Sequence, residues 1–213
     1  YSASAANANE GLFGNRTTLT SVTLGEQVKT LHKWMFAGSS IAELTIPGTV
    51  NTIANDVFYN CKNLATLTFS PSPTGEPLTI GYDTNGEAEN LFQDNNKLTT
   101  LNLNRELIYT FGDSYIDTPS EGLFGGMPTL TNVTLGENVK TLHKHMFAGS
   151  GITALVIPGT VNEIKDFAFY NCTADSLIIQ NNVDEINESA FTGSTIKDLN
   201  IYGDVASIKN SAG

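Results

Sequence analysis

Two cysteines and three histidines are the side chains of this 213-residue chain with the greatest capacity for chemistry. Cys61 and Cys172 lack the C-x-x-C spacing of a redox or zinc site. His143 and His145 form an H-x-H pair, but residues two apart in a helical turn do not face each other, so a shared metal would need a strand-like geometry. Surface decoration is the simpler interpretation of the histidines. Zinc, or a binding role at Trp34, is the alternative.

A run of acids offers a second kind of site. The oxygen-bearing residues alternate along one segment as they do in a calcium loop, at Asp83, Asn85, Glu87 and Glu89. The segment lacks the Asp-rich start of the EF-hand loop and the glycine at its sixth position. We therefore expect a solvated acidic loop, with calcium as the alternative. No other metal and no cofactor is expected.

No catalytic motif accompanies these residues. The sequence contains no G-x-S-x-G, G-x-x-x-x-G-K-[ST] or H-E-x-x-H pattern. Paired carboxylates occur only in two long segments described below, where a glycosidase pair is the one alternative. The sequence predicts a protein that is not an enzyme.

Composition argues against a nucleic-acid ligand and against a transmembrane segment. The net charge is −11 and the calculated pI is near 4.5, whereas phosphate binding needs a basic stripe, so we expect no nucleic-acid ligand. No segment approaches the ~20 apolar residues of a membrane helix, so we expect no transmembrane segment. The chain starts at Tyr1 without a signal-peptide pattern, which we interpret as a processed product or a fragment of a longer chain.

An internal duplication reveals the elements that would position these residues. Residues 10–61 and 121–172 align without a gap, with 37 identities in 52 positions. Within each block a phenylalanine preceded by an apolar residue recurs every 22 or 23 residues. Over the whole chain it stands at Phe13, Phe36, Phe58, Phe92, Phe124, Phe147, Phe169 and Phe191.

A short strand pattern follows each phenylalanine, as in Ile41-x-x-Leu44-x-Ile46. A fixed period that carries this L-x-x-L-x-L pattern is the signature of a leucine-rich-repeat solenoid. We predict a mainly β fold with short helical or 3-10 turns and about eight coils of 22–23 residues. One domain should cover residues 1–213, with stacked coils that bury a continuous core.

Two columns of the repeat predict local structure. Two residues after each phenylalanine the chain carries Gly, Asn or Asp, which tolerate a left-handed backbone and so predict the end of the turn. The next column includes Cys61 and Cys172, four coils apart. At the ~4.8 Å strand spacing they should lie roughly 19 Å from each other, whereas disulfide Cα atoms approach within about 7 Å. We expect two free, buried cysteines, with a reactive or metal-binding thiol as the alternative.

The repeat also resembles a known family. The units V-N-E-I-K-D-F-A-F-Y-N-C, which ends at Cys172, and V-D-E-I-N-E-S-A-F, which ends at Phe191, are similar to the motif I-x-x-x-A-F-x-x-C-x-x-L-x-x-I-x-I-P of the BspA-like leucine-rich-repeat surface proteins. The resemblance covers roughly residues 12–208, although the proline is present only at Pro47 and Pro158. It implies a secreted or surface-displayed bacterial protein that adheres to host proteins, other cells or matrix, and it implies no catalytic residues.

Two consecutive coils depart from the repeat, each by about ten extra residues, in segments 70–90 and 104–122. Both segments follow the strand, so they should project from the same side of adjacent coils and touch. Loops on a rigid scaffold commonly carry binding residues. Candidate ligand-binding residues are therefore the aromatic residues of these segments, Tyr82, Tyr109, Phe111 and Tyr115. The alternative is a tolerated surface insertion.

The outward positions of the strands form the other candidate surface. They are rich in Thr and Asn, whose hydroxyls and amides suit glycans or extended polar protein surfaces but equally suit a solubilising sheet face. The candidates are Thr23, Thr45, Thr68, Asn102 and Thr134. A further column holds residues as different as Trp34, His145, Asp56 and Ser189, and this tolerance predicts that the column is exposed.

These observations predict a non-enzymatic binding module, secreted or displayed on a bacterial cell surface. It would mediate adhesion to, or recognition of, macromolecules of a host or a neighbouring cell, with an extracellular protein or glycan as its partner. The alternatives are a structural spacer or stalk that displays another module, and a glycan-binding accessory module.

Overall fold

The computed structural model describes residues 11–81, 91–92, 95–109 and 122–209. In these residues the chain forms strands and hydrogen-bonded turns, and none of them lies in a helix that could span a membrane. The chain divides into two compact units, which we call unit 1 (Tyr1–Leu98 with Leu107–Tyr115) and unit 2 (Thr99–Glu106 with Ile116–Gly213). Whether one domain covers residues 1–213 stays a prediction.

Unit 1 consists of coils with a strand on each of two sides. The longer strands β2 (Glu43–Ile46) and β4 (Thr66–Phe69) are parallel and in register, with Leu44 opposite Leu67. The shorter strands form a second parallel sheet in the order β1 (Thr30–Leu31), β3 (Thr52–Ile53), β5 (Leu78–Ile80) and β7 (Leu107–Ile108).

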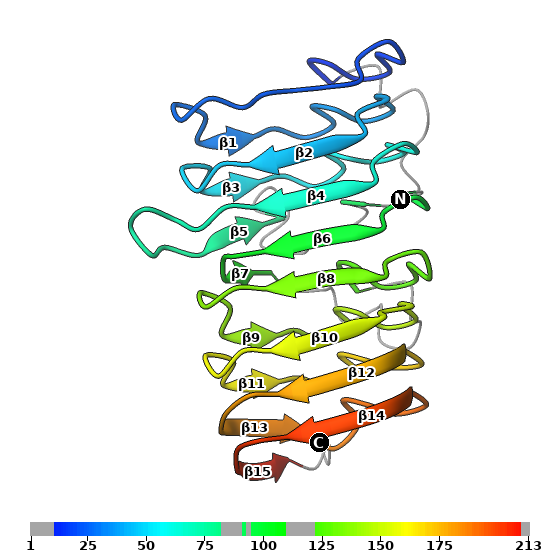
Figure 1. Ribbon diagram of the computed structural model, residues 1–213. Coiled ribbons are helices and arrows are strands. Elements are labelled where there is room, and N and C mark those ends of the chain that lie inside the picture. Colours follow the sequence, from blue (N-terminus) through cyan, green and yellow to red (C-terminus); the bar gives the residue numbers. More distant parts are fainter. Residues whose placement is uncertain (1–10, 82–90, 93–94, 110–121, 210–213) are drawn as a thin grey trace. The chain divides into compact units, whose positions relative to one another are not determined.

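Unit 2 repeats this arrangement over more coils. Its longer strands follow one another as β6 (Thr100–Leu103), β8 (Asn132–Leu135), β10 (Ala154–Ile157), β12 (Thr173–Ile179) and β14 (Thr195–Ile201). Its shorter strands are β9 (Thr141–Leu142), β11 (Glu163–Ile164), β13 (Val183–Asn187) and β15 (Val205–Lys209). In Figure 1 the longer strands of unit 2 lie side by side, with the shorter strands in a second layer. The predicted β-rich leucine-rich-repeat solenoid is confirmed.

The core of each unit lies between its two sheets. Along β2 and β10 exposed and buried residues alternate, so that the leucine and isoleucine of the repeat point inward. Leu67, Ile157 and Ile164 have no exposed side-chain surface. A fully buried residue of this size contributes about 1.5–3 kcal/mol, and because each coil covers the next, this gain recurs at every coil.

The repeated phenylalanines form a stacked column within each unit. In unit 1 the rings of Phe13, Phe36, Phe58 and Phe92 follow one another at centroid distances of 5.8, 6.1 and 5.5 Å. In unit 2 those of Phe124, Phe147, Phe169 and Phe191 do so at 6.1, 5.7 and 5.1 Å. The predicted column is therefore confirmed within each unit. The turns at these residues are single i to i+3 turns, as between the Ser39 N–H and the Phe36 carbonyl.

The predicted left-handed column is confirmed at seven of its positions. Two residues after each phenylalanine the backbone φ lies between 51° and 70°, at Asn15, Gly38, Asn60, Gly126, Gly149, Asn171 and Gly193. The remaining member, Asp94, lies outside the described residues. Gly, Asn and Asp adopt this conformation at the lowest steric cost, which explains the composition of the column.

The two long coils keep the second strand of the repeat. Besides their extra residues, segments 70–90 and 104–122 contain β5 and β7, which pair with their neighbours in the shorter-strand sheet. The sequence pattern does not reveal these strands. Their inward residues do not show the three-residue spacing seen at Val50 and Ile53, and in β5 they are Leu78 and Ile80, two residues apart.

Candidate functional site

The outward face of the longer-strand sheet carries the predicted hydroxyl rows in both units. In unit 1 Thr45 lies directly opposite Thr68, and a bridge between Ser21 and Glu43 places Thr23 in the same row. Thr23 and Thr45 are exposed and Thr68 is half-buried. The sequence-predicted residues of unit 1 are therefore brought together as one row along neighbouring strands.

Unit 2 has a corresponding row that begins with the other two predicted residues. Asn102 lies opposite Thr134, and the row continues through Val156 and Ile178, which are also opposite each other. Val156 is 40% exposed although it is apolar. The outward residues of β6, β8 and β10 carry no charge, since the row beside this one consists of Thr100, Asn132 and Ala154.

The aromatic candidates of the long segments are placed differently. Tyr82, Phe111 and Tyr115 lie outside the described residues, as do the calcium candidates Asp83, Asn85, Glu87 and Glu89. Tyr109 is described, but its side chain is only 5% exposed, in the inward column that also holds Ile80. A surface position for Tyr109 is therefore wrong: it directly follows β7 and takes the place of a core residue.

Metal ligands do not gather among the described residues. No group of three or more His, Cys, Asp or Glu side chains that could hold a metal occurs in residues 11–81, 91–92, 95–109 and 122–209. The calcium candidates stay a prediction, because none of them falls within these ranges.

Both cysteines are free and buried, as the column argument predicts. The Cys61 thiol lies 3.1 Å from the Phe36 carbonyl and 3.5 Å from the Ser39 hydroxyl, and Cys172 lies 3.4 Å from the Ser150 hydroxyl. Burial raises the pKa of both thiols and outweighs the hydrogen bonds that lower it. Because the thiolate is the nucleophile, these cysteines pack as small residues and are protected from reaction.

A second surface, which we call the ridge, runs along the turns that precede the phenylalanines, at residues 32–34, 54–56, 143–145 and 165–167. Four of its residues have a left-handed backbone although they are not glycine, with φ between 55° and 57°: Trp34, Asp56, His145 and Phe167. Such a conformation is rare and unfavourable for bulky residues. Sequence reasoning missed it, because Trp, His and Phe give no signal for a positive φ.

The ridge is less exposed than its variable composition predicts. Asp56 and His145 are each only 5% exposed, so the expectation of an exposed column is wrong at these positions. The left-handed turn folds the His145 ring back against its neighbours, with centroids 5.2 Å from Phe167 and 6.4 Å from Tyr170. A side chain on Gly122 would come within 1.6 Å of the His145 carbonyl oxygen, which explains the glycine there.

The ridge of unit 1 has different chemistry at the same positions. The Lys33 ammonium lies 5.0 Å from the centre of the Trp34 ring and 3.6 Å from the Asp56 carboxylate. In unit 2 the residue that corresponds to Asp56 is Phe167, and it packs edge-on against Tyr170 at 5.6 Å. The ridge is thus a charged and aromatic contact in unit 1 and an aromatic cluster in unit 2.

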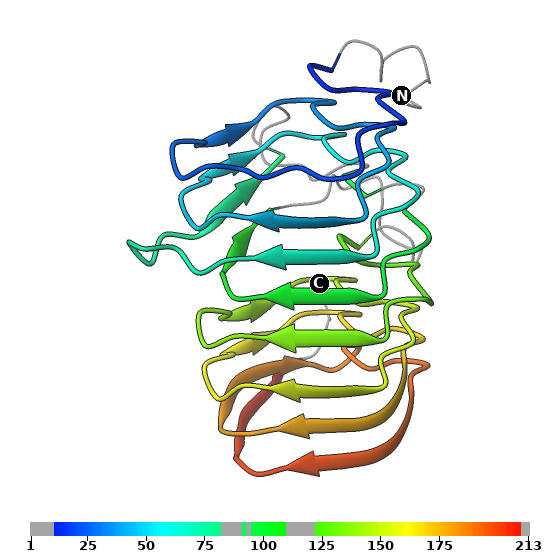
Figure 2. The same ribbon diagram turned by 45° about the horizontal axis from the view of Figure 1, so that its top comes forward.

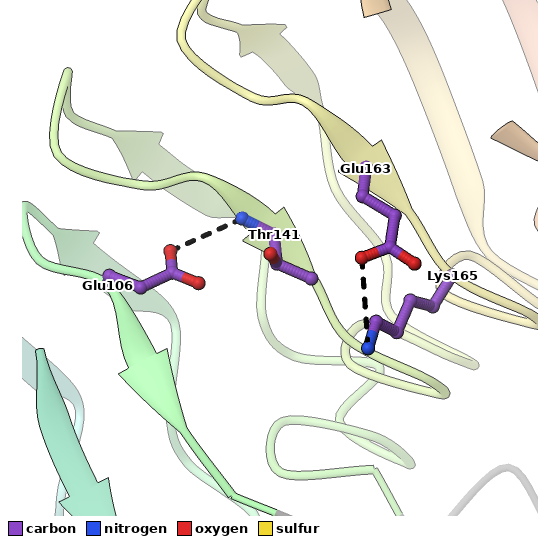
Figure 3. Close-up of polar contacts among 4 residues, drawn as sticks. All are labelled: Glu106, Thr141, Glu163 and Lys165. Atoms are coloured by element: carbon purple, nitrogen blue, oxygen red, sulfur yellow. Dashed lines mark hydrogen bonds and ion pairs between the residues drawn. The ribbon is translucent and has the colours of Figure 1, made fainter. Parts of the chain in front are cut away.

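Glu106 supports unit 2 in a way that the sequence does not reveal. Its carboxylate accepts hydrogen bonds from the N–H groups of Lys140, at 2.6 Å, and Thr141, at 3.2 Å. Figure 3 shows the bond from Thr141. In the next coil the equivalent N–H groups, of Asn162 and Glu163, donate to the backbone carbonyl of Lys140. The carboxylate of Glu106 therefore takes the place of a backbone carbonyl as the hydrogen-bond acceptor for the N–H groups at the start of β9. Burial raises its pKa, although these two hydrogen bonds lower it.

This architecture of parallel strands on two sides of 22–23-residue coils, with columns of phenylalanine and leucine between them, defines a leucine-rich-repeat protein. A family model of the BspA-type leucine-rich repeat region matches six copies of its repeat, over residues 2–76 and 118–212. The chain belongs to this family. No curated protein matches it.

Two crystal structures are similar to the chain. One is a leucine-rich repeat protein from Bacteroides ovatus ATCC 8483, with 20% identity and a TM-score of 0.50 over 88% of this chain and 51% of that chain. The other is a leucine-rich cell surface protein from Faecalibacterium prausnitzii A2-165, with 21% identity and a TM-score of 0.43 over 86% and 54%. The chain spans about half the length of both proteins. The first comparison shows the same fold.

Proposed function

We propose that this protein is a non-enzymatic binding module, secreted or displayed on the bacterial cell surface, that adheres to or recognises macromolecules of a host or a neighbouring cell. The observation that carries the proposal is the part of the longer-strand face that has no charged side chain, on β6, β8 and β10. In a chain with a net charge of −11, the outward residues of β6, β8 and β10 include no charged side chain. Solubility alone does not require uncharged outward residues, since charged residues keep other parts of the surface soluble.

The proposed contact residues are Thr23, Thr45 and Thr68 in unit 1 and Asn102 and Thr134 in unit 2. Thr45, Thr68, Asn102 and Thr134 lie on parallel strands, and Thr23 follows the bridge between Ser21 and Glu43. The neighbouring coils fix each row, so the hydroxyls and amides lose little conformational freedom on binding. An extracellular protein is the proposed ligand. A glycan is the second candidate, because hydroxyl and amide groups in an uncharged row match the hydrogen-bonding groups of sugars.

The long segments contribute a second, separable part of the proposal. Tyr82, Phe111 and Tyr115 are proposed to contact the ligand, since tyrosine suits recognition surfaces. Tyr109 is left out because its side chain is in the core. The calcium loop at Asp83, Asn85, Glu87 and Glu89 is tested on its own by calcium uptake in equilibrium dialysis and by the effect of a chelator on thermal unfolding.

The test is an array of matrix proteins and glycans probed with the purified chain. Thr45→Arg and Thr134→Arg place a long charged side chain in each row, and we expect them to abolish binding to every spot that the parent chain retains. Thr18→Arg and Thr192→Arg are the matched controls, because both threonines are exposed on the turn side of the coils. A variant that lacks residues 82–90 and 110–121 keeps β5 and β7 and tests the long segments alone.

The outcomes separate the proposals. If the parent chain binds no spot, it is a spacer and the proposed function is wrong. If the two row variants bind as the parent does, the sheet face is not the contact surface. If the loop variant alone loses binding, the long segments carry the recognition. Binding confined to glycan spots would favour the glycan-binding module.

A further inference from the structure

Three aliphatic side chains adjoin on the outward face of unit 2, and we call them the aliphatic patch: Ala154, Val156 and Ile178. Val156 lies directly opposite Ile178 on the neighbouring parallel strand, two residues along β10 from Ala154. Ala154 and Val156 are exposed and Ile178 is half-buried. β10 and β12 lie side by side in both views (yellow and orange in Figures 1 and 2). Single exposed aliphatic residues are ordinary on a protein surface, whereas adjoining ones on a proposed binding face are a candidate contact.

The first copy of the duplication, residues 10–61, shows that the coil does not need this patch. At the positions of Ala154 and Val156 it carries Glu43 and Thr45, which are both exposed. The inward leucine between them is equally buried in the two copies, with 3% exposed in the first and 2% in the second. Apolar outward residues are therefore not required to form this strand.

The second copy carries its charge on the other side of the coil. Its shorter strand β11 has Glu163 where β3 of the first copy has Thr52, and Lys165 follows where the first copy has Ala54. Glu163 and Lys165 form an ion pair with 3.8 Å between Oε2 and Nζ (Figure 3). Compared with the first copy, this coil thus has lost a charge from its longer-strand face and gained charges on its shorter-strand side.

Polar residues flank the aliphatic patch, and charged residues follow on the side of β14. Asn132 of β8 and Ser176 of β12 flank the patch on the two neighbouring strands. One strand further, Asp198 of β14 lies opposite Ser176, next to an ion pair between Lys197 and Asp175. This edge holds two acids and one base, so it is negative. An apolar centre within a polar rim is the arrangement found at interfaces between proteins.

The composition of the patch favours a protein ligand over a glycan. No residue of β6, β8, β10 or β12 is aromatic, whereas the flat apolar faces of sugars pack best on aromatic rings. The methyl groups of Val156 and Ile178 instead offer an apolar surface to an aliphatic side chain of a protein. Removal of such a side chain from water strengthens binding by about tenfold or more.

The charge of the chain sets a second requirement for the ligand. The chain has a net charge of −11, and the patch itself is uncharged with a negative edge at Asp198. A ligand with a positive charge beside its aliphatic side chain is therefore attracted over a distance and oriented on the patch, whereas an acidic one meets like charge.

We infer that the aliphatic patch is the centre of the recognition surface, and that its ligand is a protein segment that presents an aliphatic side chain next to a lysine or arginine. This inference rests on the proposed function. The aliphatic side chain of the ligand lies on Val156 and Ile178, its backbone bonds to Asn132 and Ser176, and its basic side chain reaches Asp198.

The test uses short immobilised synthetic peptides, with leucine or serine at a central position and lysine or glutamate beside it. Binding of the parent chain is measured by surface plasmon resonance. We expect the leucine–lysine peptide to bind best, and replacement of its leucine by serine to weaken binding by about tenfold or more. Its association rate should fall as salt is added, because salt screens the attraction between opposite charges. Equal binding of leucine and serine peptides, or best binding of a glutamate peptide, would overturn the inference.

Variants of the chain test the patch with residues that the first copy already carries. Ala154→Glu with Val156→Thr places the first copy's residues at these positions, and it should weaken binding to the leucine–lysine peptide by about tenfold or more. Glu163→Thr makes the same kind of exchange on the shorter-strand side and is the matched control, which should bind as the parent does. Asp198→Asn should slow association a few-fold, and more at low salt than at high salt.

The outcomes distinguish this inference from the proposed function. A parent chain that binds a matrix protein equally well with and without the double substitution keeps the proposed function and overturns the role of the patch. A parent chain that binds neither a spot of the array nor a peptide overturns both. Retention of glycans alone overturns the protein ligand. Circular dichroism checks that the double variant is folded, and if it is not, Val156→Thr alone should still weaken binding several-fold.

Discussion

Residues 11–61 of unit 1 and residues 122–172 of unit 2 form the same coils from closely similar sequences, and they differ in where their substitutions fall. The inward leucine, isoleucine, valine and phenylalanine residues of the strands and turns are the same in both copies, from Leu19 and Leu130 to Phe58 and Phe169, except that Val57 is replaced by Ala168. The substitutions gather on the sheet face and on the ridge. They include Glu43 to Ala154 and Thr45 to Val156 on the face, and Trp34 to His145 and Asp56 to Phe167 on the ridge.

This difference has a physical cause. An inward residue of a stacked coil contacts the coils before and after it, so a change of volume affects two junctions. An outward residue meets only its row neighbours and solvent, so it can change chemistry without loss of the coil. The duplicated copies therefore show which positions hold the fold and which are available for recognition.

The largest expected effect comes from the shared core. Phe36 and Phe147 are 1% and 0% exposed and have ring neighbours on both sides. Phe36→Ala and Phe147→Ala should each lower the free energy of unfolding by about 3–5 kcal/mol, through lost burial and the cavity that remains. Urea denaturation followed by circular dichroism measures both. Phe13→Ala is the control, since Phe13 is 40% exposed and should cost clearly less. Equal losses at all three positions would contradict the stacked column.

Glu106, which lies outside both copies, should give the next largest effect, because its carboxylate is the acceptor of two backbone N–H groups. Glu106→Ala removes the acceptor of two backbone N–H groups and should destabilise unit 2 by about 1–3 kcal/mol. Glu106→Gln keeps an acceptor oxygen and removes the charge, so its loss should be smaller. A larger loss for Gln than for Ala would show that the carboxylate does not replace a backbone carbonyl.

The pH dependence of Glu106 follows from the direction of its pKa shift. Burial raises its pKa in the folded protein above the ordinary value of 4.5, so the folded state binds this proton more tightly than the unfolded state. The contribution of Glu106 to stability is then full below pH 4.5 and is lost as the pH rises through the raised pKa. Urea midpoints measured across this window should fall with pH more steeply for the parent chain than for Glu106→Gln.

The ridge should tolerate exchange between the copies. Trp34 and His145 share nearly the same backbone, with φ of 56° and 55°, so both already carry the strain of a left-handed turn. Trp34→His and His145→Trp should therefore each change the free energy of unfolding by no more than about 1 kcal/mol. Thermal unfolding of the two variants tests this expectation. A collapse of either variant would mean that the ridge belongs to the core and not to the variable surface.

The smallest effect is expected on the sheet face. Thr45→Val and Val156→Thr exchange the outward residues of β2 and β10, and surface substitutions of this kind usually stay within about 0.5 kcal/mol. Their effect on binding should be much larger than their effect on stability. Stability losses comparable to those of the phenylalanine variants would contradict the separation of face and core.

Much of the fold follows from periodicity alone. Spacing and residue type predict the phenylalanine column of each unit, which includes Phe58 in unit 1 and Phe147 in unit 2. They also predict left-handed positions such as Asn60 and Gly149, and the free, buried Cys61 and Cys172. The phenylalanine and the left-handed position recur along the chain, so the physical reason for each is visible many times in one sequence.

The features that sequence reasoning missed occur where a coil departs from the repeat. The strands β5 and β7 have a different apolar spacing, and Tyr109 is in the core although it stands in a segment that reads as a loop. In the sequence nothing distinguishes Glu106 from the other acidic residues. Its role depends on which backbone N–H groups near β9 need an acceptor, and only the structure shows this. The positive φ of Trp34 and His145 is imposed by the turn and not by their side chains.

The central claim is that the outward face of the longer-strand sheet, and not the shorter-strand sheet or the turn side of the coils, is the recognition surface. The most direct measurement is threonine-methyl NMR of the 22.8 kDa chain, titrated with the macromolecule that it retains best on the array. We expect the methyl signals of Thr23, Thr45, Thr68 and Thr134 to shift or broaden, while those of Thr18, Thr52 and Thr192 stay unchanged. Changes confined to Thr52 and the turn-side threonines, with the face residues unaffected, would contradict the claim.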